Sequence, residues 1–194
     1  SPNVPLLFMG EEYGETHPFP FFCDFGDEAL RDAVRRGRRE EFADFAWTGE
    51  LPDPNAQATF ESAILSWNWP AGSVQAGLRN LYRDLLQLRK SQPALGDYQH
   101  RRAELSETET SRVLVIQRGD VHQSGSRLFA AFHLSGAPAA WSPPEWPECR
   151  VLLRSEGPRY GGAHTTPLAE RLLSSWEFVV FSSTEHAMSW EANA

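Results

Sequence analysis

The sequence has 194 residues, enough for one substantial domain or two small ones. Its formal net charge of −8 disfavours nucleic acids and anionic membranes as partners, because both attract basic surfaces. With 41% hydrophobic residues the chain can bury a real core. No apolar run approaches the roughly 18 residues that a membrane-spanning helix needs, so we expect no membrane partner.

The cysteines and the first residues of the chain indicate the cellular compartment in which we expect the protein. Cys23 and Cys149 lie in unrelated sequence contexts. We expect two buried thiols in a reducing cytoplasm and keep a single disulfide as the alternative. No basic segment followed by an apolar one marks a secretory signal, so we expect a cytoplasmic protein. The chain opens at Ser1 directly before a strand of the buried type, and we interpret it as part of a longer protein.

The opening stretch joins an apolar run to a cluster of carboxylates. Residues 4–9 predict a strand buried on both faces, as in a parallel sheet. Ligands gather beyond the carboxyl ends of such strands, which is where Glu11, Glu12 and Tyr13 follow. Adjacent residues of an extended chain point to opposite faces, so we expect Glu11 and Glu12 not to act as one pair. The competing interpretation is that both are solvated loop carboxylates.

Three helices are predicted in the first half of the chain. Asp24 or Asp27 is placed to cap the first, and residues 58–65 form a short second one. The clearest helix begins near Ser73 and is closed by Pro93. Its apolar residues recur at spacings of three and four, which is typical of a helix that packs on a sheet.

Aromatic residues between these elements leave two interpretations open. Phe19, Phe21 and Phe22 follow the carboxylates, and Trp67 and Trp69 follow the short helix. Aromatic faces suit the C–H faces of a sugar ring. The same residues also serve as packing anchors, which is their commoner role.

From about Tyr98 the pattern changes to short strands. They are expected near residues 114–116, 128–134, 151–153 and 176–181, separated by turn-rich loops. Several short strands without an intervening long helix predict an antiparallel β-sandwich.

Common motifs for cofactor and metal sites are absent from the sequence. It contains no Gly-rich phosphate loop, no paired-cysteine zinc spacing, no His-Glu-x-x-His helix and no Gly-x-Ser-x-Gly elbow. We therefore expect no cofactor and no metal, and we assign no catalytic residue.

The sequence Phe-Met-Gly-Glu-Glu-Tyr-Gly-Glu at residues 8–15 resembles the end of the last barrel strand in the alpha-amylase superfamily of glycoside hydrolases. Within that superfamily the chain is most similar to the malto-oligosyltrehalose trehalohydrolase family, with glycogen branching enzymes next. Further matches lie at Phe22, Asp24, residues 37–42, Phe45, residues 52–54, 58–60, 65–67, 81–89 and 93–95. The resemblance therefore covers the chain as far as about Leu95.

The resemblance implies an α/β plus all-β fold. Residues 1–97 would be the C-terminal part of a (β/α)8 TIM barrel, with its last strand and helices, and residues 98–194 an antiparallel β-sandwich domain. In the family, the nucleophile, the acid/base glutamate and a third carboxylate come from the fourth, fifth and seventh barrel strands. This chain starts at what would be the eighth, so we expect it to be inactive alone.

The resemblance also implies a substrate class. The family hydrolyses the α-1,4 bond that releases trehalose from maltooligosyl-trehalose. Glu11, Glu12, Tyr13, Phe22 and Asp24 would shape the rim of that glucan site. The expected partners of the full-length protein are an α-glucan or maltooligosyl-trehalose, and for this chain the missing N-terminal portion of the barrel.

Two alternatives stay open at this point. The chain resembles, less closely, the matching part of a glycogen branching enzyme, and residues 22–67 argue against it. A third hypothesis is a non-catalytic carbohydrate-binding or scaffold module. In that case Trp141, Trp146 or Trp176 would hold glucan on the sandwich.

Overall fold

The computed structural model describes residues 3–43, 51–119, 127–141, 149–163 and 172–183. The chain divides into two compact units, which are described separately below. One, called the β unit, consists of Ser1–Phe8 with Trp69–Ala194, and the other, called the N-terminal unit, consists of Met9–Asn68.

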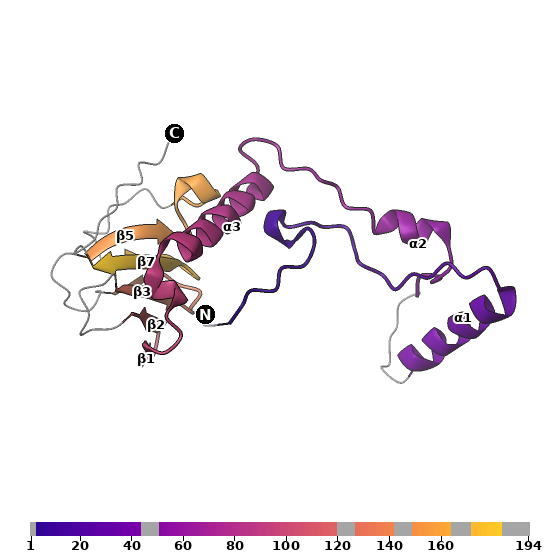
Figure 1. Ribbon diagram of the computed structural model, residues 1–194, viewed down its shortest axis with the longest axis horizontal. Helices are drawn as coiled ribbons and strands as arrows, with labels where there is room; N and C mark the ends of the chain where they lie inside the picture. Colours follow the sequence, from indigo (N-terminus) through magenta and orange to yellow (C-terminus); the bar gives the residue numbers. More distant parts are fainter. Residues whose placement is uncertain (1–2, 44–50, 120–126, 142–148, 164–171, 184–194) are drawn as a thin grey trace. The chain divides into compact units, whose positions relative to one another are not determined.

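The β unit is built on a five-stranded antiparallel sheet with strand order β1-β2-β3-β7-β5 (Figure 1). Its strands are β1 (Arg101–Glu107), β2 (Arg112–Arg118), β3 (Leu128–His133), β5 (Cys149–Arg154) and β7 (Phe178–Ser183). Two short strands, β4 (Ala139–Ala140) and β6 (Leu172–Leu173), pair in a second sheet. The helices of this unit are α3 (Val74–Ser91), α4 (Pro93–Gly96) and the 3-10 helix η2 (Pro158–Tyr160).

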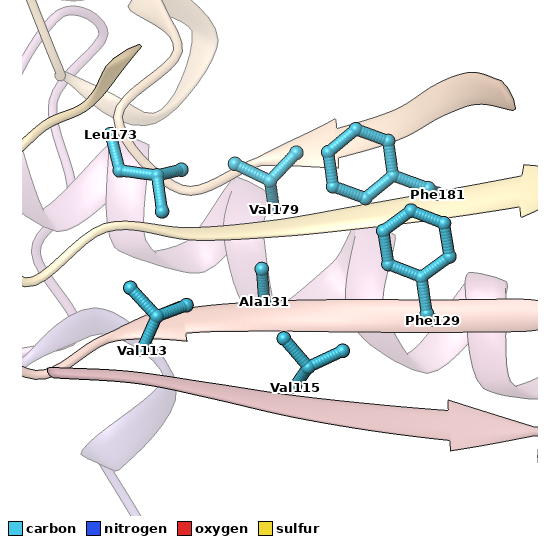
Figure 2. Packing of buried hydrophobic residues seen from close by; sticks show 7 residues of the cluster. All are labelled: Val113, Val115, Phe129, Ala131, Leu173, Val179 and Phe181. Atoms are coloured by element: carbon cyan, nitrogen blue, oxygen red, sulfur yellow. The ribbon is translucent and has the colours of Figure 1, made fainter. Parts of the chain in front are cut away.

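One face of the five-stranded sheet carries an apolar core. Phe129 of β3 is paired with Phe181 of β7, and their rings stack with centroids 4.5 Å apart. Figure 2 shows the two rings side by side, with side chains of β2 and Leu173 of the small sheet in the same cluster. The remaining members are Val113, Val115, Ala131 and Val179. Every second residue of a strand faces the same way, which is why this core follows the alternation of the sequence.

Helix α3 covers the opposite face of the sheet (Figure 1). Ser73 caps the helix, its Oγ accepting a hydrogen bond from the N–H of Ala76 at 3.1 Å. Leu88 then packs with Leu128 and Val180 of the sheet. The predicted apolar helix from Ser73 is confirmed, and in this chain its stripe lies on the antiparallel sheet.

Helix α3 also holds the loop that contains η2. A Cβ at Gly77 would lie 2.4 Å from the carbonyl oxygen of Tyr160, so only glycine allows this backbone approach. Asp84 accepts hydrogen bonds from Arg159 Nε at 2.7 Å and from the Tyr160 hydroxyl at 3.0 Å. Burial and the neighbouring Asp84 carboxylate raise the pKa of Tyr160 to about 12.

A buried ion pair links β5 to the turn before β7. Arg154 donates from Nε to Glu177 Oε1 at 2.7 Å and from Nη2 to Oε2 at 3.0 Å. Glu177 is 0% exposed and also accepts the N–H of Ser174 at 2.8 Å. The buried His133 donates from Nδ1 to the carbonyl of Ser174 at 2.7 Å. The cluster fixes the connection between β6 and β7.

The N-terminal unit contains short elements joined by irregular segments. They are the 3-10 helix η1 (Glu11–Tyr13) and helices α1 (Glu28–Ala43) and α2 (Gln57–Ser62). Asp27, and not Asp24, caps α1, with Oδ1 accepting the N–H of Ala29 at 2.8 Å. Arg35 of α1 donates to Asp53 at 3.1 Å, and Thr59 of α2 donates to the Asp53 carbonyl at 2.7 Å. Asp53 therefore ties both helices to one connecting segment.

The predicted strand at residues 4–9 is wrong for this structure. Residues 4–8 have no regular secondary structure, and Leu6 is 94% exposed. Among the described strands none pairs with this segment. A parallel strand exists only through bonds to its neighbours, so an apolar sequence alone does not form one.

Strand β1 is not predicted from the sequence. Arg101, Arg102, Glu104 and Glu107 give it a charged composition, and all 7 of its residues are exposed. It lies at one edge of the sheet and pairs with β2. Charged side chains are common on edge strands because they discourage pairing with other chains.

The prediction of an antiparallel second half is confirmed, whereas the barrel portion and the sandwich stay predictions, as does the boundary between residues 97 and 98. Cys23 and Cys149 are both free and half-buried. Within the described ranges, no helix combines the length and apolar character required to cross a bilayer.

Candidate functional site

The carboxylate-rich motif folds as a tight turn between two glycines. Gly10 and Gly14 have φ values of +87° and +69°, a region that side chains disfavour. Between them Glu11–Tyr13 forms the 3-10 helix η1, and the N–H of Glu15 returns to the carbonyl of Gly10 at 2.9 Å. Glu11 and Glu12 therefore follow each other around a turn, and the extended geometry expected for them is wrong.

Glu15 is the centre of the hydrogen bonds that hold this turn. Its Oε1 accepts the backbone N–H groups of Thr16 at 2.8 Å and His17 at 3.0 Å. Its Oε2 accepts the Tyr13 hydroxyl at 3.0 Å and the N–H of Ser66 at 2.5 Å. One carboxylate thus joins the turn to a segment 51 residues further along the chain.

These bonds keep Glu15 ionised. The N–H of His17 has the largest effect on the pKa of the Glu15 carboxyl, burial opposes it, and the N–H of Ser66 lowers the pKa further, so that it falls from 4.5 to about 2. Because the folded pKa is the lower one, the bonds stabilise the turn at every pH above about 4.5. That stabilisation is lost as the pH falls towards about 2.

Two further contacts join the same segments. The His17 side chain donates from Nδ1 to the carbonyl of Ile64 at 2.5 Å. The rings of Tyr13 and Trp67 lie 6.3 Å apart at 34°. Tyr13 is 1% exposed and Trp67 is 65% exposed. The turn therefore buries its tyrosine and leaves the indole of Trp67 largely in solvent.

The predicted rim residues lie in different environments. Glu11 is exposed and Glu12 is half-buried, and their role as sugar contacts stays a prediction. The buried Tyr13 instead supports the turn, with burial as the main cause of its raised pKa. The structure brings these three together and adds Glu15.

Phe22 and Asp24 lie in the segment that leads to α1. Phe22 is half-buried, with its ring centroid 5.4 Å from that of Phe60. Asp24 is exposed and pairs with Arg31 at 3.4 Å. Their role as sugar contacts stays a prediction.

The tryptophans of the β unit differ in how far they are buried. Trp141 packs against the core, with centroids 6.3 Å from Phe129 and 5.9 Å from Phe181, so it is a packing residue. Trp176 is 66% exposed and has φ +59°. Trp146 lies outside the described residues.

Sequence reasoning gave no role to Glu15 or to the contact of Tyr13 with Trp67. Glu15 is part of the motif, but the distant partner Ser66 has no local signal in the sequence. In the described part of the chain, no three metal-ligating side chains gather in one place.

The chain is similar in sequence to several malto-oligosyltrehalose trehalohydrolases. It is 36% identical over 122 residues to that of Mycobacterium tuberculosis, 62% of this chain and 21% of the relative. Identity is 44% over 100 residues with that of Deinococcus radiodurans, 50% of this chain and 16% of the relative. With that of Saccharolobus solfataricus it is 40% over 90 residues, 46% of this chain and 14% of the relative. The chain matches about a fifth or less of the length of these relatives.

A crystal structure from Salmonella typhimurium, described as that of an alpha-amylase-type protein, is similar to the fold. It superposes with a TM-score of 0.65 and 30% identity, over 94% of this chain and 28% of that one. No family model matches the chain. The resemblance stated from the sequence is thereby confirmed: this chain is similar in sequence to part of malto-oligosyltrehalose trehalohydrolases and in fold to part of an alpha amylase.

Proposed function

We propose that the chain is the C-terminal part of a glycoside hydrolase that releases trehalose from maltooligosyl-trehalose by hydrolysing an α-1,4 bond. The observation that supports this most is the glycine-bracketed turn, which carries the exposed Glu11 and the half-buried Glu12. Carboxylates at such a place accept hydrogen bonds from sugar hydroxyls. They serve as rim contacts, and the catalytic carboxylates belong to the rest of the enzyme.

The exposed apolar segment at residues 4–8 supports the same proposal. Val4, Leu6 and Phe8 are well exposed, although their sequence is that of a buried strand. Exposed apolar runs of this kind mark surfaces that pack against another partner. In the proposed enzyme that partner is the remaining part of the barrel.

A chimera tests the proposal. Residues 9–95 of this chain replace the matching stretch of the Deinococcus radiodurans trehalohydrolase, and trehalose released from maltooligosyl-trehalose is measured. We expect the chimera to retain turnover and the 194-residue chain alone to show none. A folded chimera without trehalose release, or a pure 194-residue chain that liberates trehalose, contradicts the proposal. Transfer of glucan in place of free trehalose would indicate a branching enzyme.

The role of Glu11 and Glu12 as rim contacts is tested separately. Changing Glu11→Gln and Glu12→Gln in the chimera should raise KM with little change in kcat, because rim contacts bind substrate and transition state alike. A fall in kcat at unchanged KM would assign these residues a different role.

A second candidate function rests on Trp176. An exposed tryptophan with a positive φ is a strained residue, and such residues concentrate at binding sites. Glucan binding by the β unit as a carbohydrate-binding module would depend on this side chain. Titration with maltoheptaose decides between the two, since the module requires saturable binding that Trp176→Ala abolishes.

A further inference from the structure

The second tryptophan with a positive φ lies beside the glycine-bracketed turn. Trp67 has φ +48°, and within the described ranges it shares this left-handed backbone only with Trp176 among residues other than glycine. Bulky side chains avoid this region because Cβ crowds the backbone. Such strain persists only where surrounding contacts impose it, and it concentrates at ligand sites.

The contacts around Trp67 come from the turn and from the residues directly after it. Glu15 accepts the N–H of Ser66 at 2.5 Å, directly before Trp67. His17 donates to the carbonyl of Ile64 at 2.5 Å, three residues before it. The buried ring of Tyr13 lies 6.3 Å from the indole. Residues in the turn and directly after it therefore contact both the backbone and the side chain of this segment.

These contacts do not bury the side chain that they position. Trp67 keeps 65% of its surface exposed, while Tyr13 beside it keeps 1%. A tryptophan that served only as a packing anchor would be covered, as Trp141 is partly covered by Phe129 and Phe181. A strained backbone that presents an exposed indole is a feature that packing within this unit does not explain.

We infer that Trp67 is a stacking platform for a pyranose ring of a neutral α-glucan, and that Glu15 is its positioning residue. An indole offers a flat apolar face to the C–H face of a sugar, and pockets for such ligands combine aromatic walls with a few polar groups. Glu11 and Glu12, on the same turn as the tyrosine that contacts Trp67, supply acceptors for sugar hydroxyls. The inference rests on the proposed function for the class of its ligand.

Trp69 provides a matched control two residues away. It is half-buried, and the guanidinium of Arg79 lies 4.6 Å from its ring centroid. This face of Trp69 is therefore already occupied by a cation. If sugar bound to any tryptophan in this stretch, Trp67 and Trp69 would both respond when a sugar is added.

The experiment follows the indole N–H resonances of the full 194-residue chain by NMR during titration with maltoheptaose. The resonance that disappears in Trp67→Phe should shift saturably, while that of Trp69 stays in place. Trp67→Ala should weaken the affinity by at least about tenfold, as loss of a stacking side chain does. Trp69→Ala should leave the affinity within about twofold. A Trp67 resonance that stays fixed at millimolar maltoheptaose overturns the inference, and so does binding that depends on Trp176 alone.

The role of Glu15 is tested by a double-mutant cycle. Glu15→Gln should weaken binding in the native sequence and have no further effect when Trp67→Ala is already present, because both act through the same indole. Equal losses in the two backgrounds would show that Glu15 acts elsewhere. The outcome is separable from the proposed function, since a chimera that releases trehalose with an unchanged KM after Trp67→Ala contradicts only this inference.

Discussion

The two units of the chain are stabilised by different kinds of contact. In the β unit, apolar side chains are buried on both faces of the five-stranded sheet, against α3 on one face and Leu173 on the other. In the N-terminal unit, α1 has no buried residue, and Arg35 and Asp53 form one of several ion pairs there. Exposed pairs of this kind contribute little, about 0–1 kcal/mol each.

This difference has a consequence for the candidate site. Glu15, Tyr13 and Trp67 all lie in the unit with little buried apolar surface, so the site depends on hydrogen bonds and local backbone geometry. Regions with few buried apolar contacts open at a lower free energy than the core does. We therefore expect substitutions in the β unit to change global stability and those in the N-terminal unit to change local order.

The largest expected effect is in the sheet core. Phe129→Ala removes a fully buried ring stacked on Phe181, and should lower the free energy of unfolding by about 4 kcal/mol. Urea denaturation followed by far-UV circular dichroism measures it. The matched control is Phe19→Ala in the N-terminal unit, where the ring is 68% exposed and the change should stay within about 0.5 kcal/mol. Similar losses for both would contradict the contrast between the units.

The buried ion pair should come next. Glu177→Gln leaves the Arg154 charge buried without its carboxylate and should cost about 3 kcal/mol in the same assay. The control replaces both partners, Arg154→Met with Glu177→Leu, and should restore most of that loss because no buried charge remains. A double variant as unstable as the single one would show that the ion pair itself, and not the unpaired charge, determines stability here.

A smaller and more local effect is expected at Gly10. In Gly10→Ala the new Cβ would lie 2.6 Å from Cβ of Glu15, at a φ of +87°. The strain should cost about 2 kcal/mol and expose the amides of the turn to hydrogen exchange. Gly37→Ala, in α1 with open space around its Cβ position, should leave exchange in the turn unchanged. If the amides of the turn stay protected from exchange in Gly10→Ala, the turn does not require glycine at this position.

The same contrast explains which features the sequence predicts. The apolar stripe of α3 and the alternation of β3 are local patterns, and both elements form where expected. Strand β1 was missed because its edge position allows a charged sequence. The strand expected at residues 4–9 fails for the opposite reason, since its pattern is right but its pairing depends on other strands.

The candidate site divides in the same way. The carboxylates at Glu11 and Glu12 were expected on an extended chain, whereas Gly10 and Gly14 fix a turn there by local geometry. The hydrogen bond between Glu15 and the N–H of Ser66 is not predictable, because Ser66 lies 51 residues further along the chain. Long-range hydrogen bonds leave no periodic signal, so they are found only when the chain is folded.

The smallest effect compares two helix caps directly. Asp27 caps α1 and Ser73 caps α3, each by accepting backbone N–H groups of the first turn. Replacing either by alanine should cost about 1 kcal/mol of helix stability. Because α3 packs on the sheet, Ser73→Ala should lower the global free energy of unfolding by that amount, and so lower the urea midpoint.

In α1, where no residue is buried, the same loss should appear as fraying of the helix with the global midpoint unchanged. Amide hydrogen exchange along Glu28–Ala43 measures the fraying of Asp27→Ala. A shift of the global midpoint by Asp27→Ala as large as that by Ser73→Ala would mean that α1 unfolds together with the sheet.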